Sequence, residues 1–144
     1  MTIRAIVSGR EHAIISVDAR QKVSDVIQLL SEKRIGAVPV IEDGAVIGIF
    51  SERDVIYCIA SKGAAALDYP VAEVMTSPAV TVESDLPALT ALSLMTRRRI
   101  RHLPVVESDG RIAGFISIGD LVKYRIDRIE GEANAMRDYI QGVT

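Results

Sequence analysis

A serine and an aspartate three positions apart occur twice in the sequence, and they are the residues best suited to chemistry. The stretch Gly48–Asp54 (GIFSERD) returns as Gly114–Asp120 (GFISIGD). Each copy reads as the end of an apolar strand followed by the first turn of a helix. A helix N-terminus offers N–H groups to a phosphate, and a carboxylate can accept hydrogen bonds from both hydroxyls of a ribose. Ser51 with Asp54, and Ser117 with Asp120, could therefore hold a small polar ligand.

The same pattern has a simpler explanation, because Ser-x-x-Asp ahead of an apolar run is a helix capping box. The serine oxygen accepts a backbone N–H, and the acid suits the positive end of the helix dipole. A binding role is favoured by the recurrence of the corner, and by a glycine three positions before each serine, where a side chain would block close approach. Strand–helix corners are also where ligands commonly bind in α/β folds. Both interpretations stay open at this point.

Composition limits the other kinds of chemistry. The chain has 144 residues, 49% apolar and 25% charged, with a net charge of −2, which indicates a globular domain without a global field for nucleic acid or a membrane. Cys58 is the single cysteine, so we expect no disulfide or thiolate metal site and a buried apolar role for this residue. His12 is interpreted as a surface residue. We expect no metal and no catalytic activity, because no nucleophile with a base and no phosphate-binding loop is found.

No apolar run reaches the length of a membrane span, and the N-terminus lacks the features of a signal peptide. A cytoplasmic protein without membrane contact is therefore expected.

Apolar periodicity predicts the same order of elements twice. Aligning 15–54 with 80–120 gives 12 identities in 40 pairs, so two βαββα units are expected, each of about 60 residues and marginal alone. We expect them to share a core across a pseudo-two-fold axis in an α+β or α/β fold. The Asp43-Gly44 and Asp109-Gly110 dipeptides predict hairpin turns. The predicted strands are 13–17, 37–41, 46–50, 79–82, 103–106 and 112–116, with helices from Val23, after Ser51, around 88–95 and after Asp120.

These elements give a division into a lead-in (1–13), a first repeat (14–61), a linker (62–78), a second repeat (79–126) and a C-terminal helical extension (127–144). In the last helix, apolar residues alternate steps of four and three, which is the a/d seam of a coiled coil. We expect this stripe to pack in a homodimer, with packing against its own subunit as the alternative. Its members are Val122, Ile126, Ile129, Ala133, Met136 and Ile140.

The repeated Gly-x-x-Ser-x-x-Asp signature, preceded by Val-Pro-Val or Leu-Pro-Val and an Asp-Gly turn, resembles the CBS domain, named after cystathionine β-synthase. Two copies joined through Val74-Met75-Thr76 resemble a CBS pair, or Bateman module, of the stand-alone type. The resemblance implies a non-catalytic sensor whose cleft binds AMP, ADP, ATP, S-adenosylmethionine or NAD(H). It also implies a homodimer and a regulated partner protein that the sequence does not name.

The resemblance assigns roles to particular residues. Asp54 and Asp120 match the ribose-binding aspartates, and Ser51 and Ser117 match the hydroxyls near the phosphate. Arg101 and His102 match phosphate-contacting positions, and their counterparts Gly36 and Ala37 are small, so two unequal sites are expected. The candidate binding residues are completed by Arg53, Thr81 and Arg99.

Two other functions are weighed against nucleotide sensing. The first is an interaction module without a ligand, in which the Ser-x-x-Asp corners only cap helices. The second is nucleic-acid binding through the basic cluster Arg97–His102, which is disfavoured because no aromatic residues are interleaved for base stacking.

Overall fold

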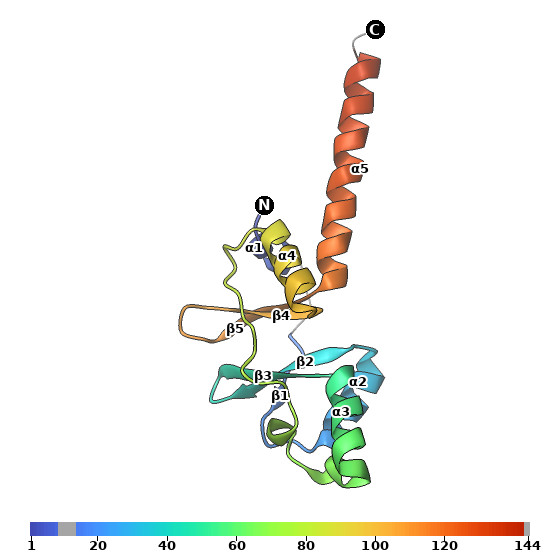
Figure 1. The fold of residues 1–144 in the computed structure, drawn as a ribbon. Coiled ribbons are helices and arrows are strands. Elements are labelled where there is room, and N and C mark those ends of the chain that lie inside the picture. Colours follow the sequence, from blue (N-terminus) through green and yellow to red (C-terminus); the bar gives the residue numbers. More distant parts are fainter. Residues whose placement is uncertain (9–13, 143–144) are drawn as a thin grey trace.

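The computed structural model describes residues 1–8 and 14–142. These residues form two lobes whose β-sheets face each other, with the helices on the outer sides (Figure 1). The first lobe holds β1 (Val17–Asp18), α2 (Val23–Lys33), β2 (Ala37–Glu42), β3 (Ala45–Ser51) and α3 (Glu52–Lys62). The second holds α4 (Ala88–Arg98), β4 (His102–Val106), β5 (Ile112–Ser117) and the start of α5 (Ile118–Gly142). The expected mixed fold with two repeats and a C-terminal helix is confirmed.

Each lobe is built on an antiparallel hairpin with the predicted turn. In the first lobe β2 pairs antiparallel with β3 and parallel with β1, and in the second β4 pairs antiparallel with β5. Asp43 and Gly44 have φ of 51° and 81°, the positive values that a two-residue hairpin loop requires. Gly110 has φ of 87°. The two Asp-Gly predictions are therefore correct.

The first strand of each repeat is shorter than the sequence predicts. In place of 13–17, the strand covers Val17–Asp18, with Ala13 outside the described residues. In place of 79–82, the chain contributes a single parallel bridge between Val82 and Val105. The first correction has a physical reason, since Ile14 and Ile15 turn their side chains into the space between the lobes.

The N-terminal segment belongs to the second lobe. Helix α1 (Ile3–Ser8) places Ile3, with no exposed surface, in a core cluster with Leu103, Ile116 and Leu121. The Ile3 backbone N–H donates to the Leu86 carbonyl over 2.9 Å. The second core is therefore closed by residues from the opposite end of the sequence.

A matching segment closes the first lobe. The short 3-10 helix Val71–Glu73 buries Val71 in the first core cluster, and the Val71 N–H donates to the Gln21 carbonyl over 2.7 Å. Residues 2–8 and 70–76 thus make equivalent contacts with opposite lobes, so the pseudo-two-fold relation extends beyond the two βαββα units.

These two segments explain the glycines that precede the serine corners. A Cβ added to Gly48 would lie 2.5 Å from the Met75 sulfur and 2.8 Å from the Thr76 carbonyl oxygen. A Cβ added to Gly114 would lie 2.8 Å from a Val7 methyl. The close approach inferred from the sequence is therefore made by other segments of the same chain, which pack against Gly48 and Gly114.

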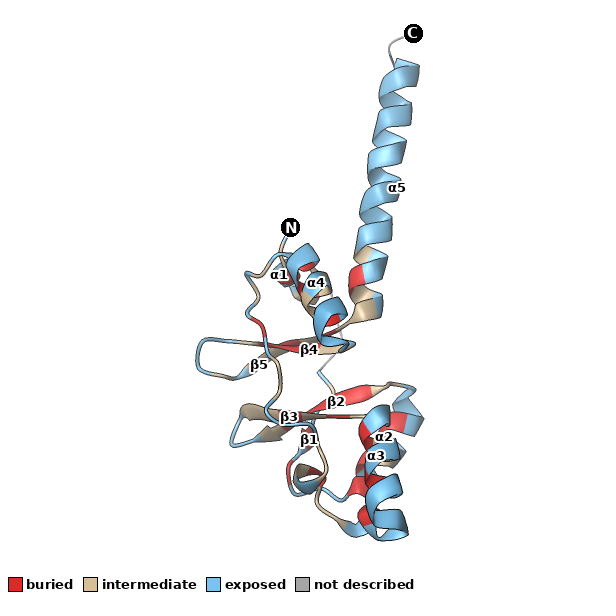
Figure 2. Ribbon diagram, viewed as in Figure 1, coloured by how far each residue is buried: buried red, intermediate tan, exposed pale blue. Residues whose placement is uncertain are grey.

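Helix α5 runs for 25 residues and projects from the body, exposed along most of its length (Figure 2). Leu121 is the buried residue within it. Among the described residues, no helix has the length and apolar character needed to cross a membrane.

Gly48→Ala should destabilise the protein by roughly 1–3 kcal/mol, the usual effect of overpacking a tight contact. Gly131→Ala is the matched control, because a Cβ at Gly131 in α5 meets nothing within 4 Å. This control should stabilise the chain by up to about 1 kcal/mol through helix propensity. Urea unfolding of both variants measures the two free energies, and a Gly48→Ala protein as stable as the wild type would contradict the packing described.

Candidate functional site

Both serine–aspartate corners adopt capping geometry. At the start of α3, the Ser51 N–H donates to Asp54 Oδ2 over 2.9 Å and the Asp54 N–H donates to Ser51 Oγ over 3.4 Å. At the start of α5, the Ser117 N–H donates to Asp120 Oδ2 over 2.7 Å and the Asp120 N–H donates to Ser117 Oγ over 3.1 Å. The capping interpretation is therefore correct for both corners, and a binding role must come from what surrounds them.

The corner at Asp54 is covered by the segment that links the repeats. Asp54 is buried, and its Oδ1 accepts a 2.7 Å hydrogen bond from the Thr76 hydroxyl. Two backbone hydrogen bonds between Ile49 and Thr76, of 2.9 and 3.0 Å, hold that segment along β3. The Ser51 hydroxyl lies 3.1 Å from Asp54 Oδ2. Both carboxylate oxygens of Asp54 thus have partners within the protein.

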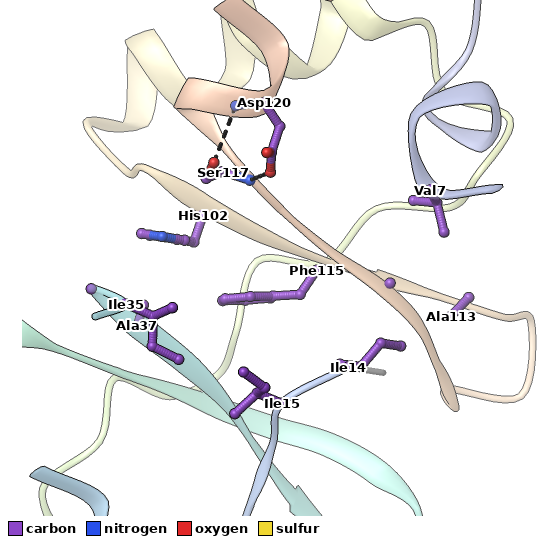
Figure 3. A pocket seen from close by; sticks show the side chains of 12 residues that line it. Val7, Ile14, Ile15, Ile35, Ala37, His102, Ala113, Phe115, Ser117 and Asp120 are labelled. Atoms are coloured by element: carbon purple, nitrogen blue, oxygen red, sulfur yellow. Dashed lines mark hydrogen bonds between the residues drawn. The ribbon is translucent and has the colours of Figure 1, made fainter. Parts of the chain in front are cut away.

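The corner at Asp120 opens into a cavity of about 710 Å³ between the lobes (Figure 3). Small-molecule sites are typically clefts of about 300–1,000 Å³ with apolar walls and a few polar groups. Here the polar side chains are His102, Ser117 and Asp120. The other lining residues are Val7, Ile14, Ile15, Ile35, Gly36, Ala37, Ala113, Gly114 and Phe115.

The two hairpins position these walls. The start of β2 and the end of β3 meet at the Ala37–Ser51 pair, and the start of β4 and the end of β5 meet at the Ser117–His102 pair. Each hairpin also anchors the next helix, since the Glu52 N–H donates to the Gly36 carbonyl over 3.0 Å and the Ile118 N–H to the Arg101 carbonyl over 2.7 Å. Residues of the first lobe therefore face the polar corner of the second.

His102 lies flat on Phe115, with ring centroids 5.3 Å apart and ring planes 13° from parallel. Burial lowers the pKa of His102 below its usual 6.5; Asp120 and Glu52 oppose this shift and Arg101 adds to it. The imidazole is therefore neutral at pH 7 and can donate or accept a hydrogen bond. A Cβ at Gly36 would be in ordinary van der Waals contact with His102 Cε1, at 3.8 Å, and would crowd Glu52 Oε1, at 3.1 Å.

The structure divides the candidate residues into three groups. Five line the cavity, namely Gly36, Ala37, His102, Ser117 and Asp120. Ser51 and Asp54 form the corner that Thr76 covers. The exposed side chains Arg53, Thr81, Arg99 and Arg101 are not among the lining residues described.

Arg99 has a conformational role, because it ends α4 in the left-handed region with φ of 55°. Arg34 ends α2 in the same way, with φ of 52°. The identity between these two positions in the repeats thus reflects the same helix ending.

Sequence reasoning did not identify the apolar walls of the cavity. Ile14, Ile15 and Ile35 come from the first repeat, whereas Phe115 comes from the second. The signal for them was the duplication itself, since a pseudo-two-fold axis brings the start of one repeat to the serine–aspartate corner of the other.

Predictions were also made from the sequence for the cysteine, for a metal site and for His12. Cys58 is buried as predicted, and burial raises the pKa of its thiol. Within residues 1–8 and 14–142, no three His, Cys, Asp or Glu side chains are grouped to hold a metal ion. His12 lies outside the described residues.

Thr76→Val should destabilise the protein by about 1.5–3 kcal/mol, because it removes a hydrogen bond to a buried carboxylate while keeping the side-chain shape. Thr81→Val, at an exposed position, makes the same change and should stay within about 0.5 kcal/mol of the wild type. Equal unfolding free energies for the two variants in urea would show that the Thr76–Asp54 contact is unimportant.

His102 should make the protein less stable in mild acid. Its pKa is lowered in the folded state, so as pH falls below about 6.5 the unfolded chain takes up the proton first and stability declines. His102→Phe, which keeps a flat ring on Phe115, should lose less stability than the wild type between pH 7.5 and 5.5. If both proteins lost the same unfolding free energy in urea between pH 7.5 and 5.5, the result would argue against a half-buried neutral imidazole.

Comparison with known proteins bears on this arrangement. The family model described as CBS domain matches residues 10–61 and 71–127. The CBS domain-containing protein CBSX3, mitochondrial, of Arabidopsis thaliana is 34% identical over 125 residues, which cover 83% of this chain and 60% of that protein. The present chain is thus shorter than this relative. The compartment in that name belongs to the relative, and the cytoplasmic location of this chain stays a prediction.

Solved structures agree in fold. The CBS-domain containing protein ATU1752 from Agrobacterium tumefaciens is 36% identical, with a TM-score of 0.80, and the match covers 87% of this chain and 99% of that one. CBSX2, solved in complex with AMP, shares the fold at 24% identity, with a TM-score of 0.75 and coverage of 88% and 96%. Two matched repeats, the serine–aspartate corners and the facing hairpins lead to one conclusion: this chain belongs to the CBS-domain family and is a CBS pair.

Proposed function

We propose that this chain is a non-catalytic regulatory module that binds one adenosine-containing nucleotide in the cavity at Asp120. The observation that carries the proposal is the cavity itself, whose walls are apolar and come from both lobes, with His102, Ser117 and Asp120 as its polar side chains. A nucleoside has the matching character, because its base is flat and its ribose carries two hydroxyls.

Each group of lining residues has a distinct role in this proposal. Ile15, Ile35 and Ala37 contact the base, and Asp120 accepts hydrogen bonds from the ribose hydroxyls. The negative charge of Asp120 must face the ribose, because a phosphate placed beside it would be repelled. His102 and Ser117 are the donors that remain for the phosphate, with Arg101 outside the cavity contributing positive charge.

The corner at Asp54 has a structural role in the same proposal. Its carboxylate already accepts hydrogen bonds from the Ser51 N–H and the Thr76 hydroxyl, so a ribose would have to displace a segment that is hydrogen-bonded along β3. Asp120 lines the cavity and Asp54 is not among its lining residues, so we infer one ligand per chain, although the sequence contains the signature twice.

AMP is the first probe to use, since the CBS pair of CBSX2 was solved with it. ADP, ATP, NAD(H) and S-adenosylmethionine are the comparison ligands. Binding would favour one of two pre-existing arrangements of the lobes and so report the nucleotide level to a partner protein.

A ligand-free interaction module is the competing function. It is favoured by the capping geometry at both corners, which needs no ligand to explain the serine and the aspartate. Nucleic-acid binding through Arg97–His102 has less support, because His102 from that cluster is stacked on Phe115.

Asp120→Ala should weaken AMP binding roughly ten- to a hundred-fold, the loss expected for about 1.5–3 kcal/mol of hydrogen bonding to a charged group. Thr76→Val, at the other corner, should leave AMP affinity unchanged. Isothermal titration calorimetry measures both, and urea unfolding confirms that each variant is folded. Full affinity in Asp120→Ala would refute the ribose assignment, and no heat with any of the adenosyl ligands would favour the interaction module.

A further inference from the structure

The projecting part of α5 carries an apolar stripe that its own lobe does not cover. The stripe consists of Val122, Ile126, Ile129, Ala133, Met136 and Ile140, all of them exposed. The large side chains among them keep 43–63% of their surface accessible. Leu121, which is buried against the second core, lies on a different face of the helix. The alternative that the stripe packs back on its own subunit is thus wrong for this structure.

The spacing of the stripe places its members at successive a and d positions of a heptad. Ile126, Ala133 and Ile140 occupy a, and Val122, Ile129 and Met136 occupy d. These layers do not themselves select the number of strands, because the two-stranded preference of β-branched a residues requires leucine at d. The seam spans residues 122–140, about 28 Å at 1.5 Å per residue, which gives three a layers and three d layers.

The charges beside the seam determine which partner fits. The flanking e and g positions set partner choice and orientation in coiled coils. Arg125 and Glu132 occupy g, and Glu130 and Arg137 occupy e. In a parallel, in-register pair, each g residue faces the e residue five positions later on the other helix, so Arg125 meets Glu130 of the second copy and Glu132 meets Arg137 of the second copy. Two-fold symmetry gives each contact twice.

The antiparallel arrangement places like charges together. With the seam layers aligned, Glu130 would face Glu130 of the second copy, and Lys123 would face Arg137 of the second copy. Like charges at such positions are destabilising. Arg128, which lies outside the seam, holds Glu132 within one helix at 3.4 Å, and a carboxylate can accept a further hydrogen bond from Arg137 of the second copy.

We infer that α5 is a dimerisation helix that pairs, parallel and in register, with α5 of a second copy of this chain. The inference rests on the seam and on the charges beside it, and it does not depend on nucleotide binding. In the dimer both pairs of lobes lie at the N-terminal end of the paired helices, so the two cavities are carried side by side.

Disulfide cross-linking of the full chain tests the orientation. Ile129→Cys puts a thiol at a d position, where a parallel pair brings the two copies of the residue face to face within disulfide reach. Mild oxidation should therefore convert most of the protein to a covalent dimer on a non-reducing gel. An antiparallel pair would place residue 129 opposite Ala133 of the second copy and would give no such product.

The matched control is Asn134→Cys, which lies at b on the outward face of the same helix and should stay monomeric on the gel. The wild type should also stay monomeric, because Cys58 is buried. Equal cross-linking of Ile129→Cys and Asn134→Cys, or none in either, would overturn the proposal.

Charge reversal provides an independent test. Arg125→Glu should weaken dimerisation several-fold at low salt, and Arg125→Glu combined with Glu130→Arg should restore it, because the attraction is re-formed with the signs exchanged. Sedimentation equilibrium measures both dimer dissociation constants. A double variant as weak as the single one, or an Ile126→Asp protein that remains dimeric, would show that the chain does not pair through this seam.

Discussion

The facing arrangement of the two sheets is the constraint on which the rest of the structure depends. Because of this arrangement, residues 35–37 at the start of the first hairpin lie opposite residues 115–120 at the end of the second hairpin. Neither lobe could provide this cavity alone, since Ile14, Ile15 and Ile35 come from the first repeat, whereas Phe115 and the polar side chains come from the second. Each lobe has its own core cluster, so the single shared core expected from the sequence is wrong, and Ile3 from the N-terminus completes the second cluster. A repeat of about 60 residues is marginally stable alone, so residues 2–8 and 70–76, which complete the two core clusters, contribute to the stability of the lobes.

Identical sequence signatures have different surroundings in the two lobes. Ser51 with Asp54 and Ser117 with Asp120 make the same capping hydrogen bonds. Thr76 covers the first corner through a hydrogen bond to its aspartate, whereas the second corner lines a cavity of about 710 Å³. Duplication therefore gives a scaffold with two equivalent positions, and the segment that precedes the second repeat covers the first of them.

Local signals in the sequence predict most of the fold, while contacts between distant segments escape them. The Asp-Gly turns, the apolar helix faces and the capping serines depend on neighbours in the chain, and these predictions are correct. Close approach at Gly48 was also foreseen, but Met75 makes that approach. For the site, the polar residues His102, Ser117 and Asp120 could be named from the motif. The apolar walls at Ile14 and Ile15 depend on how the repeats face each other, and periodicity along the chain carries no information on that.

A crystal structure of the protein grown with AMP is the most direct test of the central claim. The account predicts one nucleotide per chain, with its base between the lobes near Ile35 and Ala37, its ribose on Asp120, and the hydrogen bond between Thr76 and Asp54 intact. A nucleotide bound at Asp54 with residues 74–76 displaced, or a cavity at Asp120 that stays empty at saturating AMP, would contradict it.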